Sequence, residues 1–299
     1  MKDEIVIAEA LGGQVRIHAM RSAEMVEEAR KAHNLWPTSC AALGRTMTVG
    51  ALMASDLKRE DEHVMIRISG SGPVGAIRVE ADGAGNVRGF PDNPSVYLSR
   101  PDGHLDVGKA VGRDGTLTVS KDMGLKEPFS GTVALVSGEI GDDFAYYYAV
   151  SEQTPSVVAV GVLVNTDCSV RTAGGMIIQL LPGASEETVS SVEQTAARMR
   201  PMTEYMSTSM TVEELIRELF PDAVILGHRD ARWHCSCSKE RFAESMAALS
   251  EKDLDDMINE DHGAEVVCQY CSRKYLYSED ELRAVREIRK RVADRKRAD

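Results

Sequence analysis

Residues 233–238 read Trp-His-Cys-Ser-Cys-Ser, and residues 266–272 read Val-Val-Cys-Gln-Tyr-Cys-Ser. Each stretch holds two closely spaced cysteines, and thirty residues separate the two pairs. A folded segment between the pairs can bring four thiolates together, and structural zinc is usually held by four such ligands. We therefore expect Cys235, Cys237, Cys268 and Cys271 to bind one Zn²⁺. The spacing also allows a redox switch, since each pair is close enough in sequence to form a disulfide once the metal is lost.

The cysteine content and the N-terminus indicate the compartment in which these thiols act. Six cysteines in 299 residues are too few for a disulfide scaffold. Residues 1–16 begin with acidic side chains and hold only a short apolar run, which is not typical of a signal peptide. No stretch approaches the ~20 apolar residues that span a bilayer. We expect a cytoplasmic protein with no membrane partner, in which paired cysteines are metal ligands or redox sensors.

The charge of the chain argues against binding to nucleic acid. The net charge is −12, and almost all of it falls within residues 1–231. Phosphate backbones are bound by clustered Lys and Arg, which an acidic body does not offer.

The first 183 residues predict an α+β domain that forms the body of the protein. Runs that alternate or are rich in β-branched residues predict strands at residues 4–9, 15–19, 64–69, 75–80, 132–137 and 157–164. Turn signals between such runs are Asp82-Gly83, Asp114-Gly115 and Asn165-Thr166-Asp167. Helices are expected from Ser22 to about His33, from Pro37 to about Leu57, and from about Asp142. Short strands joined by hairpins favour a layered α+β domain over a doubly wound parallel sheet.

Residues 184–231 predict a helical linker of marginal stability. Ser185 begins one helix, whose apolar residues Val189, Val192, Ala196 and Met199 form a narrow stripe. Thr211 and Glu214 form a capping box for a second, shorter helix. Isolated helices of this length are scarcely stable in water, so the order of the linker depends on the surface against which it docks.

Residues 232–299 predict a small module built around the four cysteines. Ser238 and Ser250 each begin a short helix, and a hairpin is expected with Glu265 to Val267 on one strand and Tyr275 and Tyr277 on the other. Ser278 and Glu281 form a capping box for a C-terminal helix that becomes basic. Its basic residues are Arg283, Arg286, Arg289, Lys290, Arg291, Arg295, Lys296 and Arg297, which we expect to be solvated. With little core of its own, the module would gain much of its folding free energy from the metal, on the order of 10 kcal/mol.

Other chemistries fit the cysteines less well. Four thiolates leave no open coordination position for hydrolysis, and His234 is not part of the His-x-Glu signature of a deaminase. Cys268 and Cys271 join two expected strands, whereas a thioredoxin-like motif lies between a strand and a helix. His234 and His262 are near the pairs but are not needed as ligands, and Cys40 and Cys168 are expected to be bystanders. We expect a binding protein with no catalytic residues.

Longer stretches of the chain resemble one known family. They are AALGRTMTVGAL at 41–52, NVRGFPDNP at 86–94, GEIGDDFAYYYAVSEQTP at 138–155 and AGGMIIQLLPG at 173–183, followed by the four cysteines at the family's spacing. Together these motifs resemble the 33-kilodalton heat-shock chaperones, the redox-regulated holdases of bacteria, over almost the whole chain.

The resemblance implies a mechanism. One Zn²⁺ on the four cysteines would keep the reduced protein inactive, and oxidants would form the disulfides Cys235–Cys237 and Cys268–Cys271 and expel the metal. Loss of zinc would unfold the module and remove the docking surface of the linker helices. The exposed surface would then bind unfolding client proteins without ATP, and the resemblance also implies a homodimer on activation. The alternatives are a zinc-stabilised interaction protein with no redox response and a thiol oxidoreductase.

Overall fold

The chain forms an α+β fold, as expected, that divides into two compact units. The computed structural model describes residues 2–298, with side chains as far as residue 289. The units are Met1–His234 and Cys235–Asp299. The expected division into a body, a linker and a module, at residues 183 and 231, remains a prediction about function.

The first unit contains two β-sheets. The five-stranded sheet, here called sheet A, has the order β10-β1-β2-β9-β8 and is antiparallel throughout. Its strands are β1 (Glu4–Ala10), β2 (Val15–Arg21), β8 (Ser156–Val164), β9 (Val170–Leu180) and β10 (Val224–Asp230). The six-stranded sheet B has the order β11-β5-β4-β3-β6-β7, with only the β11–β5 pair parallel. Its strands are β3 (His63–Ser69), β4 (Ala76–Asp82), β5 (Asn86–Pro91), β6 (Thr116–Asp122), β7 (Phe129–Ala134) and β11 (Arg232–Trp233).

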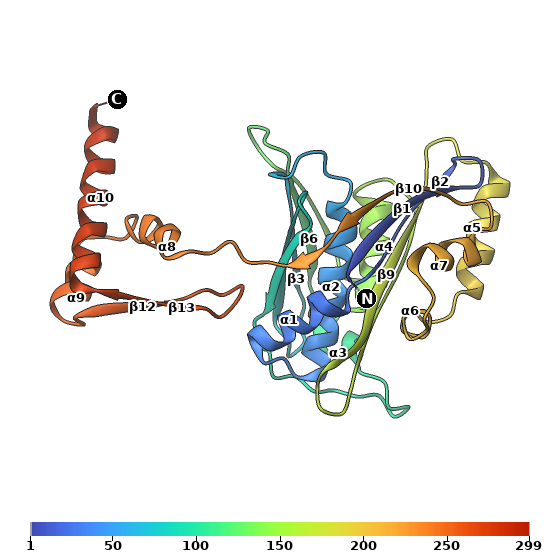
Figure 1. Cartoon of the computed structure of the whole chain (residues 1–299), viewed down its shortest axis with the longest axis horizontal. Helices are drawn as coiled ribbons and strands as arrows, with labels where there is room; N and C mark the ends of the chain where they lie inside the picture. The colour runs from blue at the N-terminus through green and yellow to red at the C-terminus, as the bar shows by residue number, and fades with distance from the viewer. Residues whose placement is uncertain (1, 299) are drawn as a thin grey trace. The chain divides into compact units, whose positions relative to one another are not determined.

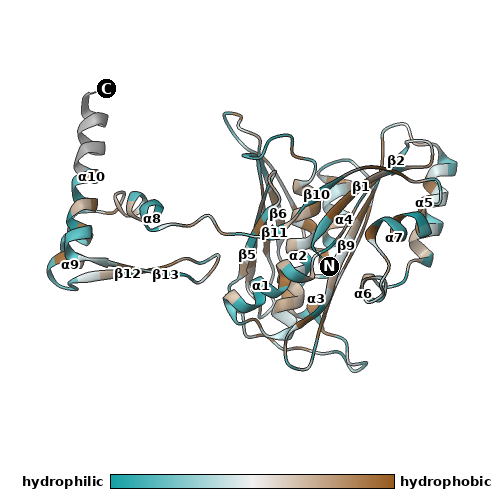
Figure 2. Cartoon of the chain, viewed as in Figure 1, coloured by the Kyte–Doolittle hydropathy of each residue, from teal (hydrophilic) through white to brown (hydrophobic). Residues whose placement is uncertain are grey.

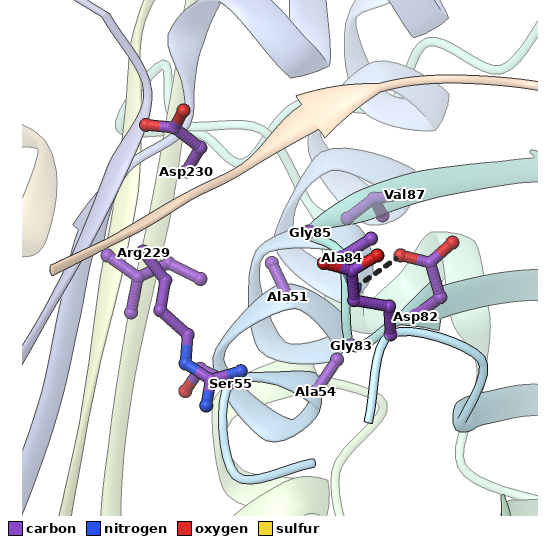
Figure 3. Close-up of a pocket in the computed structure, with 12 residues that line it drawn as sticks. Ala51, Ala54, Ser55, Asp82, Gly83, Ala84, Gly85, Val87, Arg229 and Asp230 are labelled. Atoms are coloured by element: carbon purple, nitrogen blue, oxygen red, sulfur yellow. Dashed lines mark hydrogen bonds between the residues drawn. The ribbon is translucent and has the colours of Figure 1, made fainter. Parts of the chain in front are cut away.

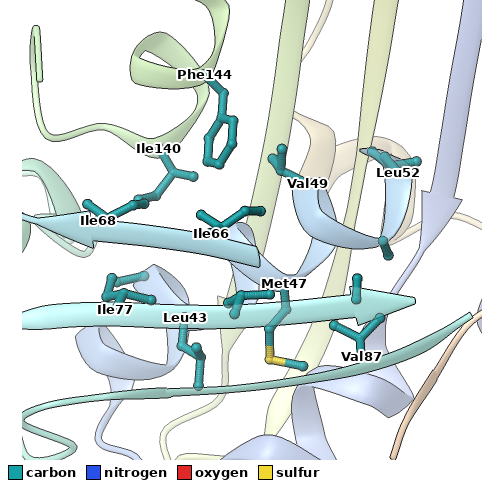
Figure 4. Close-up of a cluster of buried hydrophobic side chains, with 14 of the residues drawn as sticks. Leu43, Met47, Val49, Leu52, Ile66, Ile68, Ile77, Val87, Ile140 and Phe144 are labelled. Carbon is teal, nitrogen blue, oxygen red and sulfur yellow. The ribbon is translucent and has the colours of Figure 1, made fainter. Parts of the chain in front are cut away.

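A central helix, α2 (Pro37–Ala54), lies between the two sheets and contacts strands of both (Figure 1). Nearly all of its residues are buried, which is typical of a helix that is apolar on every side. Leu43, Met47 and Leu52 of α2 pack among apolar side chains of sheet B and of α4 (Ile140–Val150), as Figure 4 shows. This cluster is the main core of the first unit.

Two further helices complete this layer, α1 (Ala23–His33) and α3 (Val107–Val111). The expected start of α1 at Ser22 is confirmed, but the Ser22 side chain makes no cap and bonds to the Thr48 hydroxyl at 2.8 Å instead. The cap comes from Asp3, whose carboxylate accepts hydrogen bonds from the Met25 and Glu24 amides at 2.6 and 3.2 Å. A long-range contact therefore replaces the local cap that the sequence predicts.

The opposite face of sheet A is covered by the linker helices α5 (Glu186–Arg198), α6 (Met202–Met206) and α7 (Val212–Leu219) (Figure 1). The caps expected at Ser185 and Thr211 are present, the latter as a full capping box. The apolar side chains between the helices and the sheet form a second core, here called the linker cluster. It comprises Val6, Ala8, Ala10, Val15, Ile17, Ala19, Met176 and Ile178 from the sheet and Val192, Met202, Tyr205, Met206, Val212, Leu215, Ile216 and Phe220 from the linker.

The linker differs from the prediction in three respects. The sequence-based mechanism made the zinc module the docking surface of the linker helices, whereas the surface on which the structure places them is sheet A. Along α5, Val192 is buried as expected, but its buried neighbours are Thr188 and Thr195. The linker is also not helical throughout, because β10 pairs with β1 from Glu4↔Asp230 to Glu9↔Val224.

Two local predictions for the body are also corrected. The strand expected at residues 132–137 is β7, Phe129–Ala134, so it begins and ends three residues earlier. Asp114-Gly115 does not join two strands but connects α3 to β6. The hairpin turns at Asp82-Gly83 and at residues 165–167 are confirmed between β4 and β5 and between β8 and β9.

The second unit has a small core. It consists of α8 (Lys239–Met246), α9 (Glu251–Asn259), the hairpin of β12 (Gly263–Val267) and β13 (Lys274–Ser278), and α10 (Glu279–Ala298). Its buried apolar side chains are Met246, Leu254, Ile258, Tyr277, Leu282 and Val285. Figure 2 shows hydrophilic residues over much of α8 and α9. The basic side chains expected from Lys290 onward lie outside the described residues.

Within the described part of the chain, we find no helix that combines the length and the apolar character needed to cross a membrane.

Candidate metal centre

The four cysteine sulfurs of the second unit lie together. The Sγ atoms of Cys235, Cys237, Cys268 and Cys271 are all within 4.8 Å of one another. Two separations join sulfurs of different pairs, with Cys235 to Cys268 at 3.7 Å and Cys237 to Cys271 at 3.4 Å. The two sequence pairs thus interleave in one cluster.

Two local structures position these sulfurs. Cys235 and Cys237 lie on the extended segment that ends at Ser238. Ser238 is the N-cap of α8, and its hydroxyl accepts a hydrogen bond from the Arg241 amide. Cys268 and Cys271 lie on the tight turn between β12 and β13, closed by backbone bonds from Cys268 to Arg273 and from Ser272 to Cys268 at 2.9 and 2.8 Å. The hairpin expected from the sequence therefore aims the second pair at the first.

The geometry of the cluster suits zinc. Four sulfurs arranged tetrahedrally at about 2.3 Å from Zn²⁺ are separated from one another by about 3.8 Å. The cross-pair separations of 3.7 and 3.4 Å are close to this value. A closed set of four thiolates is the donor set of a structural site, with no position for a substrate.

The four thiols have unequal environments. Burial raises the pKa of Cys268 and of Cys271. Burial acts in the same direction on Cys237, but hydrogen bonds from the Tyr275 hydroxyl and from the other three cysteines outweigh it and lower the pKa of Cys237 to about 7. Cys237 is thus the thiol whose ionised form this environment favours.

The remaining cysteines and the two nearby histidines lie outside the cluster. The backbone amide of His234 donates to the Val87 carbonyl at 3.0 Å, and His262 is exposed and pairs with Glu279 at 3.0 Å. Cys40 is buried within α2, where burial raises its pKa to about 12. Cys168 lies at the turn between β8 and β9.

Two side chains around the cluster were not foreseen as functional from the sequence. The Tyr275 hydroxyl lies 3.2 Å from the Cys237 sulfur and 3.0 Å from the Cys237 carbonyl oxygen. The Arg241 guanidinium donates to the hydroxyl and the carbonyl of Ser236, at 2.7 and 3.0 Å. The only signal for Tyr275 was its place on the expected strand four residues after Cys271.

The first unit contains a small cavity of about 250 Å³ between β10 and the β4–β5 turn (Figure 3). Two of its polar side chains form hydrogen bonds within the protein. Arg229 donates to the Leu57 carbonyl at 3.2 Å, and Asp82 accepts from the Ala84 and Asn86 amides. These internal bonds engage Arg229 and Asp82 in holding the fold.

Comparisons with known proteins agree with the fold and the site. The family model described as Hsp33 protein matches residues 3–278. The chain is 49% identical to the 33 kDa chaperonin of Shouchella clausii over 290 residues, covering 96% of this chain and 98% of that protein. It is 45% identical to the 33 kDa chaperonin of Bacillus subtilis over 287 residues, covering 95% and 98%.

A solved structure is also similar over nearly the full length. The crystal structure of the 33 kDa chaperonin from Thermotoga maritima matches with a TM-score of 0.89 and 33% identity, covering 98% of this chain and all of that chain. The resemblance seen in the sequence is thereby confirmed. The chain belongs to the Hsp33 family, and it is therefore a heat-shock chaperone that binds unfolded proteins and not an enzyme.

Proposed function

We propose that this chaperone is an ATP-independent holdase switched by the oxidation state of its four clustered cysteines. The observation that carries the proposal is the gathering of four sulfurs within 4.8 Å in a unit with a small apolar core. Such a unit depends strongly on whatever holds the sulfurs together. A change in the chemical state of the four sulfurs would therefore decide whether the unit is folded.

In the reduced state Cys235, Cys237, Cys268 and Cys271 would hold one Zn²⁺, which would cross-link the segment before α8 to the β12–β13 turn. Structural zinc contributes on the order of 10 kcal/mol to small modules near neutral pH. This contribution is comparable to the whole stability of a typical domain. The reduced module is therefore folded only while its thiolates remain available.

Oxidation would remove the thiolates. For each disulfide, two cysteine thiolates give two electrons to one molecule of hydrogen peroxide; an S–S bond forms, the O–O bond breaks, and two protons complete two waters. We propose the pairs Cys235–Cys237 and Cys268–Cys271, because neighbours in sequence stay close once the cluster opens. The distances of 3.7 and 3.4 Å between sulfurs of different pairs belong to the closed cluster.

The linker cluster is the proposed client-binding surface. In the closed state the linker helices cover apolar side chains of sheet A, among them Val6, Ile17 and Ile178. The chain runs from β10, the last strand of the linker, through β11 directly to Cys235, so loss of order at the cysteines begins close to the linker in sequence. Release of the linker would expose both its apolar helix faces and the sheet, which gives extended apolar surface for unfolding clients.

The remaining features of the proposal concern partners and place. Activation would be accompanied by homodimer formation, and the protein would work in the cytoplasm without binding membranes. The acidic first unit gives no basic surface for nucleic acid, consistent with a net charge of −12.

The test follows zinc, thiols and chaperone activity in one sample. Zinc release, free thiols and suppression of client aggregation are measured before and after peroxide at raised temperature. The proposal expects all three to change together, with one zinc released and two disulfides formed per chain. Zinc release without gain of anti-aggregation activity would favour a zinc-stabilised interaction protein, and catalytic turnover of a disulfide substrate would favour a thiol oxidoreductase.

A further inference from the structure

Tyr275 is held against the metal centre by two independent features. On β13 it pairs in register with Val266 of β12, which fixes its backbone beside the cysteine turn. Its ring packs against the Phe242 ring of α8, with centroids 5.3 Å apart. The hydroxyl is therefore delivered to Cys237 by a strand and a helix of the module, and its position does not depend on a flexible loop.

The hydroxyl has two acceptors within reach but only one proton. The Cys237 sulfur lies at 3.2 Å and the Cys237 carbonyl oxygen at 3.0 Å. A neutral thiol carries its own proton and can donate to the tyrosine oxygen, which leaves the hydroxyl proton for the carbonyl. A thiolate has no proton and accepts strongly, because hydrogen bonds to charged groups are about twice as strong as neutral ones.

The donors around the other pair are of a different kind. Backbone amides of Tyr270 and Cys271 approach the Cys268 sulfur, and the backbone amide of Arg273 approaches that of Cys271. Cys237 instead receives a side-chain hydroxyl, which a single substitution removes.

We propose that Tyr275 is a positioning residue of the redox switch, whose hydroxyl donates to the Cys237 thiolate of the closed centre and slows its attack on oxidants. The inference rests on the proposed function, since it concerns the reduced, zinc-holding state. Groups that hydrogen-bond to metal ligands orient them and tune their chemistry. A donor on sulfur withdraws electron density from the atom that must attack the O–O bond, so Tyr275 raises the oxidant exposure needed to open the switch.

The test compares two tyrosine-to-phenylalanine variants on the same strand. Tyr275→Phe keeps the ring that packs on Phe242 and removes only the hydroxyl. Tyr277→Phe is the matched control, because the Tyr277 hydroxyl donates to the Lys239 carbonyl at 2.5 Å and not to a cysteine sulfur. The Tyr277 side chain belongs to the apolar core of the module. Zinc-loaded wild type and variants are treated with the same peroxide concentration, and two rates are measured. These are zinc release, with a metal-sensitive dye, and loss of the free Cys237 thiol, by alkylation of aliquots and mass spectrometry.

We expect Tyr275→Phe to release zinc several-fold faster and to lose the free Cys237 thiol faster, with Tyr277→Phe close to wild type. Equal rates in the two variants, or slower release in Tyr275→Phe, would overturn the inference while leaving the zinc site intact. A wild-type chain that takes up no zinc would overturn the proposed function and this inference together.

Discussion

The two units of this chaperone are stabilised in different ways. The first unit is built around α2, which is apolar on all sides and packed between two sheets. The second has short helices, one hairpin and a small apolar core, and it places four sulfurs within 4.8 Å of one another. Many buried contacts stabilise a large core, so the loss of any one of them leaves it folded. A unit with a small core depends on its cross-link, so the loss of that cross-link alone can unfold it. The comparison leads us to expect that oxidation of the cysteines acts first on the second unit and leaves the core around α2 intact.

The linker cluster lies between these extremes. It belongs to the first unit and buries residues as large as Tyr205 and Phe220, yet its helices have only five to thirteen residues each. Helices this short are ordered by their packing and not by their own propensity. We therefore expect the linker helices to detach from sheet A more readily than the other helices of the first unit.

The largest expected effect comes from breaking the cross-link. Cys268→Ser should abolish stoichiometric zinc binding and unfold the module, since about 10 kcal/mol of metal-dependent stability is lost. Proteolysis should then cleave within residues 235–289 and leave α2 intact. Cys168→Ser is the control, because Cys168 lies on the β8–β9 turn outside the cluster and its loss should leave zinc content unchanged. A folded, protected module in zinc-free Cys268→Ser would contradict the comparison.

A second, smaller effect is expected from Arg21 on β2, which donates to the backbone carbonyls of Met206, Thr208 and Met210 in the linker. Hydrogen bonds from charged groups contribute about 2 kcal/mol each, so Arg21→Ala should loosen the linker without any oxidant. The expected results are faster proteolysis near Met210 and partial suppression of client aggregation by the reduced, zinc-loaded protein.

Arg16 provides the control for Arg21. It lies on the same strand and forms an ion pair with Glu9 at 2.9 Å. Arg16→Ala should leave the linker protected. If both variants behaved alike, the bonds from Arg21 would have no special part in holding the linker.

A third effect concerns the close approach of α6 to the sheet at Gly161. A Cβ at this position would lie 2.8 Å from the Thr203 Cγ2 atom and 3.2 Å from its backbone nitrogen. Gly161→Ala should therefore push α6 outward at a cost of about 1–3 kcal/mol. Gly227→Ala on β10 is the matched control, because no atom lies within 4 Å of its added Cβ. Hydrogen exchange at residues 202–206 should rise in the first variant only.

The smallest effect is a pH dependence confined to the first unit. Burial raises the pKa of Asp3 to about 6 from its ordinary 3.8, although the Met25 and Glu24 amides oppose this. The folded state then holds the proton more tightly than the unfolded state, so this group's contribution falls as pH rises from about 4 to 6. Relative to Asp3→Asn, the wild type should lose thermal stability between pH 4 and pH 6. Parallel pH profiles for the two proteins would contradict the assignment.

The sequence was informative where chemistry is local. The four cysteines could be assigned to one site because their residue type and spacing limit what they can do, and the caps at Ser185 and Thr211 follow from adjacent residues. Contacts between distant segments could not be foreseen. The pairing of β10 with β1, the Asp3 cap on α1 and the position of Tyr275 beside Cys237 all depend on how the chain folds back on itself. The packing of the linker on sheet A could not be foreseen for the same reason.

The central claim is that oxidation of the cysteines frees the linker from sheet A. Hydrogen exchange of residues 186–219, measured before and after peroxide, tests it most directly, with α2 as the internal reference. The account predicts that the linker amides lose protection as aggregation suppression appears, while α2 stays protected. Full chaperone activity with a linker as protected as in the reduced protein would contradict it.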